Sequence, residues 1–364
     1  MRTKHKILFS NAQSMDEIND QSIDLVVTSP PYPMIEMWDE IFAKQDPSIT
    51  DALKLNDGNH AFELMHRQLD QVWNELYRIT KPGAIVCINI GDATRTIQSE
   101  FKLYSNHSRI LNHCLKLGFN NLPNILWRKQ TNAPNKFMGS GMLAPGAYVT
   151  LEHEYILIFR KGNKRLFSTK EESQNRSESA FFWEERNVWF SDVWDLKGRK
   201  QKLGNKKSRD RSGAFPFELA YHLINMFSVK GHYVLDPFLG TGTTTITALA
   251  AGRNSIGYEI DENLSKTIAS IFNDNLLNDL NNYIRKRILN HLAFVETRKS
   301  RKGQDAFKHI NIYYDFPVMT KQERKIILNF LESIDTVNNN LIIADYITEP
   351  VLDTYSKESL FAIA

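Results

Sequence analysis

The chain has 364 residues, enough for one large or two medium domains with a substantial core. An apolar content of 42% and a charged content of 24% are ordinary for a globular protein, and a net charge of +3 is too small to identify a partner. No apolar run reaches the length of a membrane span, and the N-terminus lacks the apolar segment of a secretory signal. We therefore expect a protein of the reducing cytoplasm, in which Cys87 and Cys114 form no disulfide scaffold.

The first half of the chain alternates strand patterns with helix patterns. Residues 22–29 are a short β-rich run that predicts a buried strand, and residues 84–92 predict another. Between them, residues 62–83 show helical spacing and are expected to stop at Pro82-Gly83. A helix is predicted over 107–119, followed by strands over 122–129 and 153–162.

The second half begins with two irregular stretches. Residues 130–150 are rich in Gly, Pro and Asn, and residues 162–212 are highly charged without clean periodicity. An amphipathic helix is predicted over 215–228, a strand over 232–238, a helix over 244–252 and a strand over 254–260. From about residue 262, helical stretches alternate with basic patches. The alternation of strands and helices predicts a mainly parallel α/β sheet.

A glycine-rich turn in the second half indicates a ligand site. One strand ends at Asp236, the turn Gly240-Thr241-Gly242 leads into a helix, and the next strand ends at Glu259. Glycines let the backbone approach a ligand closely, and an acidic residue near the position of Glu259 is typical of units that bind a ribose.

The residues around this turn favour one class of ligand. The lysine of a phosphate-binding P-loop is missing, which argues against ATP, and a threonine stands where a dinucleotide fingerprint needs its third glycine. Asp236 would repel phosphates but suits an amino group. S-adenosylmethionine (SAM) carries an amino group, a carboxylate and a ribose without phosphate, so it fits better than NAD. A purely structural turn is the alternative, although it does not account for Asp236 and Glu259 together.

A second motif, Thr28-Ser29-Pro30-Pro31-Tyr32, follows the first buried strand. Together with "DPFLGTGTT", it resembles the amino-methyltransferases of DNA, in the order of their permuted β group. The resemblance covers roughly residues 5–270. It implies a Rossmann-like α/β fold of SAM-dependent methyltransferases with circularly permuted motif order, an inserted target-recognition region and a helical C-terminal addition.

The resemblance also implies roles for the residues of this loop. The Ser29 hydroxyl and the Pro30 carbonyl would accept the hydrogens of an exocyclic amine, and Pro30 and Pro31 would keep the loop rigid. Tyr32 would stack on a base that has left the duplex. The serine directly before the two prolines, Ser29, resembles the cytosine-N4 subgroup more than the adenine-N6 subgroup.

Two further groups of residues follow from the resemblance and the charge pattern. The cofactor would be contacted by Asp236, Pro237, Phe238, Gly240, Thr241, Gly242, Thr243, Glu259, Phe215 and Pro216. The basic stretch 197–211 predicts contacts to DNA phosphates, with a solvated surface loop as the alternative. Its candidate residues are Lys197, Arg199, Lys200, Lys202, Lys206, Lys207 and Arg209.

The expected organisation has four parts. Residues 1–160 would form the catalytic half, 161–205 the target-recognition region, 206–274 the SAM-binding half and 275–364 an addition of unknown role. We predict a site-specific DNA methyltransferase that acts on N4 of a flipped-out cytosine in double-stranded DNA, without a metal. It would belong to a restriction-modification system with a cognate endonuclease, as a monomer or homodimer. The alternatives are adenine-N6 methylation, an RNA amino-methyltransferase and a non-catalytic DNA-binding relative.

Overall fold

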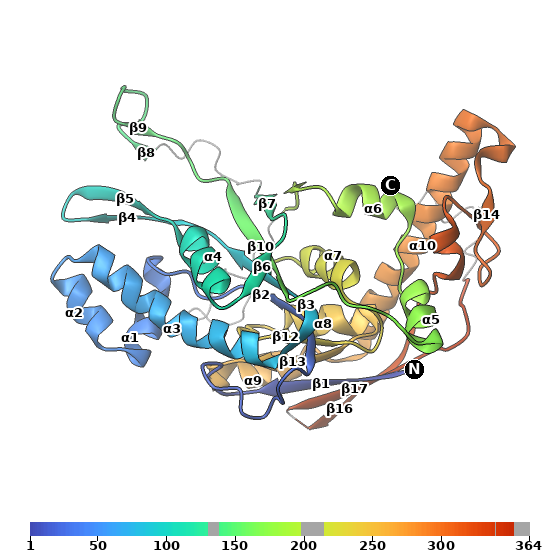
Figure 1. Ribbon diagram of the computed structural model, residues 1–364, viewed down its shortest axis with the longest axis horizontal. Coiled ribbons are helices and arrows are strands. Elements are labelled where there is room, and N and C mark those ends of the chain that lie inside the picture. The colour runs from blue at the N-terminus through green and yellow to red at the C-terminus, as the bar shows by residue number, and fades with distance from the viewer. Residues whose placement is uncertain (130–137, 198–214, 339, 353–364) are drawn as a thin grey trace.

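A large mixed sheet forms the centre of the protein. The computed structural model describes residues 1–129, 138–197, 215–338 and 340–352. The strands of the main sheet are β1 (Arg2–Leu8), β2 (Ile23–Thr28), β3 (Thr80–Ile90), β6 (Phe119–Asn121), β7 (Ile125–Arg128), β10 (His153–Lys161), β11 (Val193–Trp194), β12 (Tyr233–Asp236), β13 (Asn254–Tyr258), β16 (Leu331–Asn338) and β17 (Leu341–Tyr346). Within the described ranges they form an 11-stranded sheet in the order β11-β7-β10-β3-β2-β12-β13-β1-β17-β16, with β6 beside β10 (Figure 1).

The centre of this sheet is parallel and its edges are antiparallel. Strands β3, β2, β12, β13 and β1 run in the same direction, with Val26 paired to Val86 and Leu235 paired to Val26. All residues of β2 are buried, as expected for a central strand covered on both faces. Antiparallel β10 borders β3, and antiparallel β17 borders β1. The prediction of a mainly parallel sheet therefore holds for the centre, whereas the whole sheet is mixed.

Short hairpins and helices complete the fold. Pairs of strands outside the main sheet are β4 (Ala93–Ile97) with β5 (Glu100–Tyr104), β8 (Met138–Gly139) with β9 (Ala147–Tyr148), and β14 (His309–Ile310) with β15 (Pro317–Val318). The helices are α1 (Asp39–Gln45), α2 (Ser48–Lys54), α3 (Gly58–Ile79), α4 (Asn106–Lys116), α5 (Lys170–Glu178), α6 (Trp183–Trp189), α7 (Phe217–Phe227), α8 (Thr243–Ala251), α9 (Ser265–Ala269) and α10 (Asp274–Lys302).

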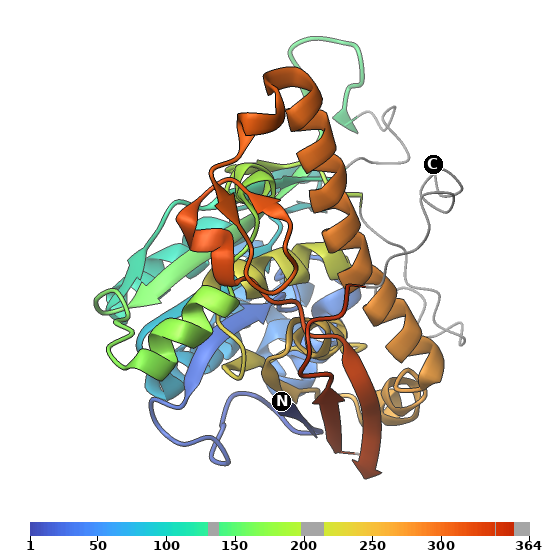
Figure 2. The same cartoon turned by 90° about the vertical axis from the view of Figure 1, so that its right-hand side faces the viewer.

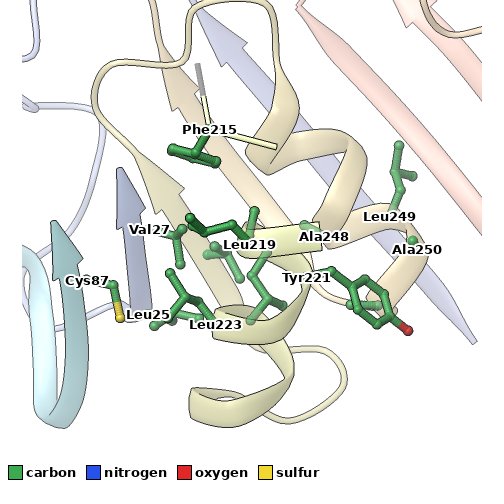
Figure 3. Packing of buried hydrophobic residues seen from close by; sticks show 14 of the residues in the cluster. Leu25, Val27, Cys87, Phe215, Leu219, Tyr221, Leu223, Ala248, Leu249 and Ala250 are labelled. Atoms are coloured by element: carbon green, nitrogen blue, oxygen red, sulfur yellow. The ribbon is translucent and has the colours of Figure 1, made fainter. Parts of the chain in front are cut away.

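Helices cover both faces of the sheet, and the alternation of strand side chains decides which residues each face buries. Leu25 and Val27 belong to the core shared with α7 and α8, where Leu219 also lies (Figure 3). Val26, between them, belongs to the opposite core, together with Trp73 of α3. Successive residues of a strand point to opposite faces, so the run Leu25-Val26-Val27 serves both cores.

The predicted end of α3, at Pro82-Gly83, is too late in the chain. The helix ends at Ile79, and β3 begins at Thr80 and runs through Pro82-Gly83. The residue before a proline is pushed away from helical dihedrals, which turns the chain into the strand before the proline is reached. The Thr80 hydroxyl donates to the Leu76 carbonyl at 2.7 Å and satisfies one of the last acceptors of the helix.

The C-terminal addition was expected to be helical, and that description is incomplete. It contains α10, which runs along one flank of the molecule, but also β14 to β17 (Figure 2). Strand β17 pairs with β1, and its alternating burial shows one face packed on the core. This pairing covers an edge of β1 that would otherwise expose unpaired backbone groups. A smaller core joins α10 to Phe182 before α6 and to Tyr314 and Phe316 near β15.

Asp24 links several segments beneath the central strands. Its buried carboxylate accepts hydrogen bonds from Lys81 at 2.8 Å, from Arg165 and from the amide of Tyr233 at 3.0 Å. Burial alone would raise the pKa of Asp24, but His232 and these donors outweigh it and hold the pKa below its ordinary value. The carboxylate therefore stays charged and connects β2 to β3 and β12.

We expect Asp24→Asn to lower the free energy of unfolding by about 2–3 kcal/mol at pH 7, because a buried charged acceptor is replaced and its cations lose their partner. A group with a lowered folded-state pKa stabilises the fold above its ordinary pKa of 3.8, so the loss should shrink as the pH falls below that value. Urea unfolding of the wild type and the variant at pH 7 and at a pH below 3.8 measures this difference. Asp20→Asn, at an exposed ion pair with Arg78, is the control and should change stability by less than about 1 kcal/mol. Equal effects of the two variants would contradict the assignment.

Candidate functional site

Two loops emerge side by side at the carboxyl ends of β2 and β12. These strands are parallel neighbours, with Leu25 opposite Val234 and Val26 opposite Leu235. The chain continues from β2 through α3 to β3 on one side, and from β12 through α8 to β13 on the other side. The strand order therefore reverses between them, which is where open α/β sheets form ligand crevices. The Ser-Pro-Pro-Tyr loop and the glycine loop both begin at this edge.

The carboxylate of Asp236 joins the two loops. It is 2% exposed and accepts from the Thr28 hydroxyl at 2.7 Å, the Thr244 hydroxyl at 2.6 Å and the Phe238 amide at 3.0 Å. Burial raises its pKa to about 6, against the donors that lower it. Three of its roughly four lone-pair positions are used inside the protein, which leaves room for one donor from a ligand.

The glycine loop adopts backbone conformations that explain its glycines. Gly240 has φ 57° and Gly242 has φ 89°, values that residues with side chains rarely adopt. Gly242 is also the N-cap residue of α8. Glu259, at the end of the next strand, accepts the Gly240 amide at 2.8 Å and the Asp261 amide at 2.8 Å. Burial raises the pKa of Glu259 to about 7.

The two loops line a common cavity of about 510 Å³. From the Ser-Pro-Pro-Tyr loop it receives Ser29, Pro30 and Pro31. Among the residues predicted to contact the cofactor, those that line it are Phe215, Asp236, Pro237, Phe238, Gly240, Thr241, Thr243 and Glu259. Gly242 and Pro216 do not line it but stand at the starts of α8 and α7. A volume of this size is typical of a small-molecule site.

Tyr32 lies beside the cavity, in a hydrogen-bonded cluster. Its hydroxyl is 3.2 Å from the Ser29 hydroxyl and donates to Glu154 at 2.9 Å. Asn89 donates from its amide nitrogen to Tyr32 at 2.9 Å and to Glu154 at 2.7 Å, and Lys129 pairs with the other oxygen of Glu154. Burial and the charge of Glu154 hold the pKa of Tyr32 well above its ordinary value, so the phenol keeps its proton.

Sequence reasoning missed Asn89 and Glu154. Asn89 is a polar residue in the otherwise apolar run of β3 and is 2% exposed, which is a signal that the sequence carries. Glu154 is the second residue of β10 and is 9% exposed. Strand register brings them together, because Ile156 of β10 pairs with Asn89. A Cβ atom on Gly91 would lie 3.0 Å from the Tyr32 ring, so a larger residue would crowd this ring where it packs.

Of the predicted DNA-binding residues, the structure describes Lys197. Lys197 is exposed at the end of a described range. Arg199, Lys200, Lys202, Lys206, Lys207 and Arg209 lie outside the described residues. Within the described ranges, no group of three or more His, Cys, Asp or Glu side chains is arranged to hold a metal ion. No helix in these ranges is long and apolar enough to cross a membrane.

Comparison with known proteins gives consistent matches at the sequence level. Residues 23–270 match the family model for N6/N4 methyltransferases, described as DNA methylase. The Type II methyltransferase M.MthZI of Methanothermobacter thermautotrophicus is 52% identical over 342 residues, which cover 93% of this chain and 94% of that protein. The Type II methyltransferase M.MjaI of Methanocaldococcus jannaschii is 50% identical over 277 residues, covering 73% of this chain and 90% of that protein.

A solved structure shares the fold. The protein TTHA0409 of Thermus thermophilus, in complex with S-adenosyl-L-methionine, superimposes with a TM-score of 0.56 at 30% sequence identity. The match covers 73% of this chain and 92% of that protein. The described sheet therefore has the arrangement of a Rossmann-like methyltransferase.

Thr28→Val should lower the free energy of unfolding by about 1.5–3 kcal/mol at pH 8, because the buried carboxylate of Asp236 loses a hydroxyl donor. The folded-state pKa of about 6 lies above the ordinary 3.8, so the wild type loses stability as the pH rises between these values. Losing a donor raises this pKa further, so the deficit of the variant should be small at pH 5 and grow towards pH 8. Urea unfolding at both pH values tests this. Thr96→Val, at an exposed position of β4, is the control. A deficit that is the same at both pH values would contradict the role of Thr28.

Proposed function

The chain belongs to the N6/N4 DNA methylase family, and on that premise we propose that it transfers a methyl group from SAM to the exocyclic N4 of cytosine in double-stranded DNA. The observation that carries the proposal is a shared cavity. Ser29 and Pro30 of one loop and Gly240 of the other line the same space, and Asp236 fixes the loops to each other. A methyl donor and an acceptor amine held there would meet.

The residues of the glycine loop fit SAM. Glu259 has two internal donors, which leave about two lone-pair positions free for the ribose hydroxyls. Asp236 has room for one donor, such as the amino group. The positive φ of Gly240 brings backbone to the edge of the cavity without a side chain in the way. When bound, SAM supplies an activated methyl group on a sulfonium.

The other loop fits the acceptor amine. An exocyclic amine on a base is a poor nucleophile, because its lone pair is delocalised into the ring. The Ser29 hydroxyl and the Pro30 carbonyl would accept its two hydrogens and let the nitrogen become pyramidal. Because two prolines restrict the loop, these acceptors need little reorganisation. Much of the remaining rate would come from proximity and orientation.

The choice of cytosine N4 rests on the Ser29 motif, which resembles the cytosine-N4 subgroup. Adenine-N6 methylation is the alternative within the same family. The two relatives named as Type II methyltransferases support a role in a restriction-modification system, for which we propose a cognate endonuclease as partner. Lys197 and the basic stretch after it would bind the phosphates of the duplex. The affinity for DNA would then fall as the salt concentration rises.

We expect DNA methylated by the purified protein to contain N4-methylcytosine, and Ser29→Ala to lower the transfer rate by about 10²- to 10³-fold with SAM affinity nearly unchanged. The reason is that Ser29 would contact the amine and not the cofactor. Labelled-methyl transfer, digestion to nucleosides and mass analysis give the rate and the product. Ser22→Ala, just before the other end of β2, is the matched control and should transfer at the wild-type rate.

Three outcomes would decide against this function. N6-methyladenine as the sole product would replace cytosine by adenine as the substrate. Transfer to RNA but not to duplex DNA would favour the RNA amino-methyltransferase. Equal inactivity of the wild type and Ser29→Ala on all DNA would favour a non-catalytic relative.

SAM binding should release protons at pH 6. Burial raises the pKa of Glu259 to about 7, so most of these carboxyls are protonated at pH 6. Ribose hydroxyls that donate to the carboxylate favour its charged form and lower this pKa, so binding expels the proton. Calorimetric titrations in buffers of different ionisation enthalpy measure the number released. Glu259→Gln should abolish most of the release and weaken binding by about 10- to 100-fold.

Glu262→Gln is the control for this experiment, because Glu262 is exposed in the short 3-10 helix that follows, Glu262–Leu264. It should bind SAM and release protons as the wild type does. Unchanged proton release in Glu259→Gln would show that the proton comes from another group, such as Asp236, and would remove the assignment of Glu259 to the ribose.

A further inference from the structure

The hydrogens around Tyr32 can be assigned by counting donors and acceptors. Lys129 donates to one oxygen of Glu154, so this carboxylate is an acceptor, and the other oxygen faces the Tyr32 hydroxyl at 2.9 Å. The single hydrogen of Tyr32 is thereby committed to Glu154. In the 3.2 Å contact between Tyr32 and Ser29, the donor must then be Ser29.

Asn89 fits the same assignment. Its amide nitrogen lies 2.7 Å from Glu154, 2.9 Å from the Tyr32 oxygen and 3.5 Å from the Ser29 oxygen. The group has two hydrogens, and the two shorter contacts use both. The reverse orientation would place the amide oxygen against a carboxylate. This explains why Asn89 Oδ1 lacks a hydrogen-bond partner among the described residues although it is buried.

We propose that Glu154 and Tyr32 form a relay that turns the Ser29 hydroxyl hydrogen away from the cavity and carries a proton out of it. This inference rests on the proposed function, because it describes how Ser29 serves the acceptor amine. With its hydrogen donated to Tyr32, Ser29 presents only lone pairs to the cavity that it lines. It can therefore accept from the amine and cannot donate to it.

The same chain of hydroxyls removes the proton that methyl transfer leaves in excess on the amine nitrogen. As the amine nitrogen bonds to the methyl carbon, the carbon–sulfur bond breaks and its electron pair stays on sulfur. The nitrogen then carries one proton in excess. Ser29 accepts this proton while its own passes to Tyr32, and the proton of Tyr32 passes to Glu154, which becomes neutral. Lys129, whose side chain is 34% exposed, connects Glu154 to solvent.

Tyr32→Phe and Glu154→Gln test the relay, because both keep the shape of the site. Single-turnover methyl transfer separates the chemical step from product release. Tyr32→Phe should lower the single-turnover rate by about 10²-fold, with the KM for DNA and the affinity for SAM nearly unchanged. Glu154→Gln should lower this rate by about 10-fold or more. The double variant should be no slower than Tyr32→Phe, since the two residues act in one chain. Glu152→Gln, an exposed carboxylate two positions from Glu154, is the matched control and should keep the wild-type rate.

The outcomes separate the relay from the proposed function. An active wild type with equally active Tyr32→Phe and Glu154→Gln variants overturns the relay alone. A loss of SAM affinity or of stability that accounts for the lower rates also overturns it, because the residues would then only support the fold. If the rate losses of the two single variants multiply in the double variant, Tyr32 and Glu154 do not act in one relay. A wild type that transfers no methyl group overturns the proposed function and the relay with it.

Discussion

The buried carboxylate of Asp236 is the interaction on which the geometry of the site depends. It holds the Thr28 hydroxyl at the end of one strand and the Thr244 hydroxyl in the helix that follows the glycine loop. Neither hydroxyl carries a charge, so burial raises the pKa of Asp236 to about 6 in spite of its three donors. Because nearly all of its hydrogen-bonding capacity is used within the protein, its main effect is to set the position of the Ser-Pro-Pro-Tyr loop relative to the glycine loop.

Strand pairing makes this contact independent of the order of the motifs along the chain. Thr28 and Asp236 are 208 residues apart in sequence, yet β2 and β12 are neighbours in the sheet. A site formed at the carboxyl ends of adjacent parallel strands requires only that the strands pair and that each leads outward to its own helix. The segment that carries the Ser-Pro-Pro-Tyr loop can therefore precede the segment that carries the glycine loop without any change in which groups meet.

The sequence predicted those parts of the fold whose signals are local. Strands 22–29 and 84–92 are short apolar runs, and the helix that is found at Phe217–Phe227 has a clear periodicity. Most of the loop residues that line the cavity were among the predicted site residues, because glycine and proline motifs are visible in the chain itself, although Leu239 was not. The contact of Asn89 with Glu154 spans 65 residues and depends on strand register, which leaves no local pattern. The pairing of β17 with β1 was missed for the same reason.

Two adjacent hydroxyls connect two of the carboxylates, Asp236 and Glu154. Thr28 donates to Asp236, whereas Ser29 faces Tyr32 and, through it, Glu154. Successive side chains of an extended chain point in opposite directions, and the proline after Ser29 keeps that residue extended. Among the described residues the carboxylates differ in their partners. Asp236 accepts from two hydroxyls and an amide, whereas Glu154 accepts from Tyr32 and Asn89 and pairs with Lys129. Asp236 thereby holds the loops in place, and in the proposed relay Glu154 receives the proton, so the dipeptide Thr28-Ser29 joins these two tasks.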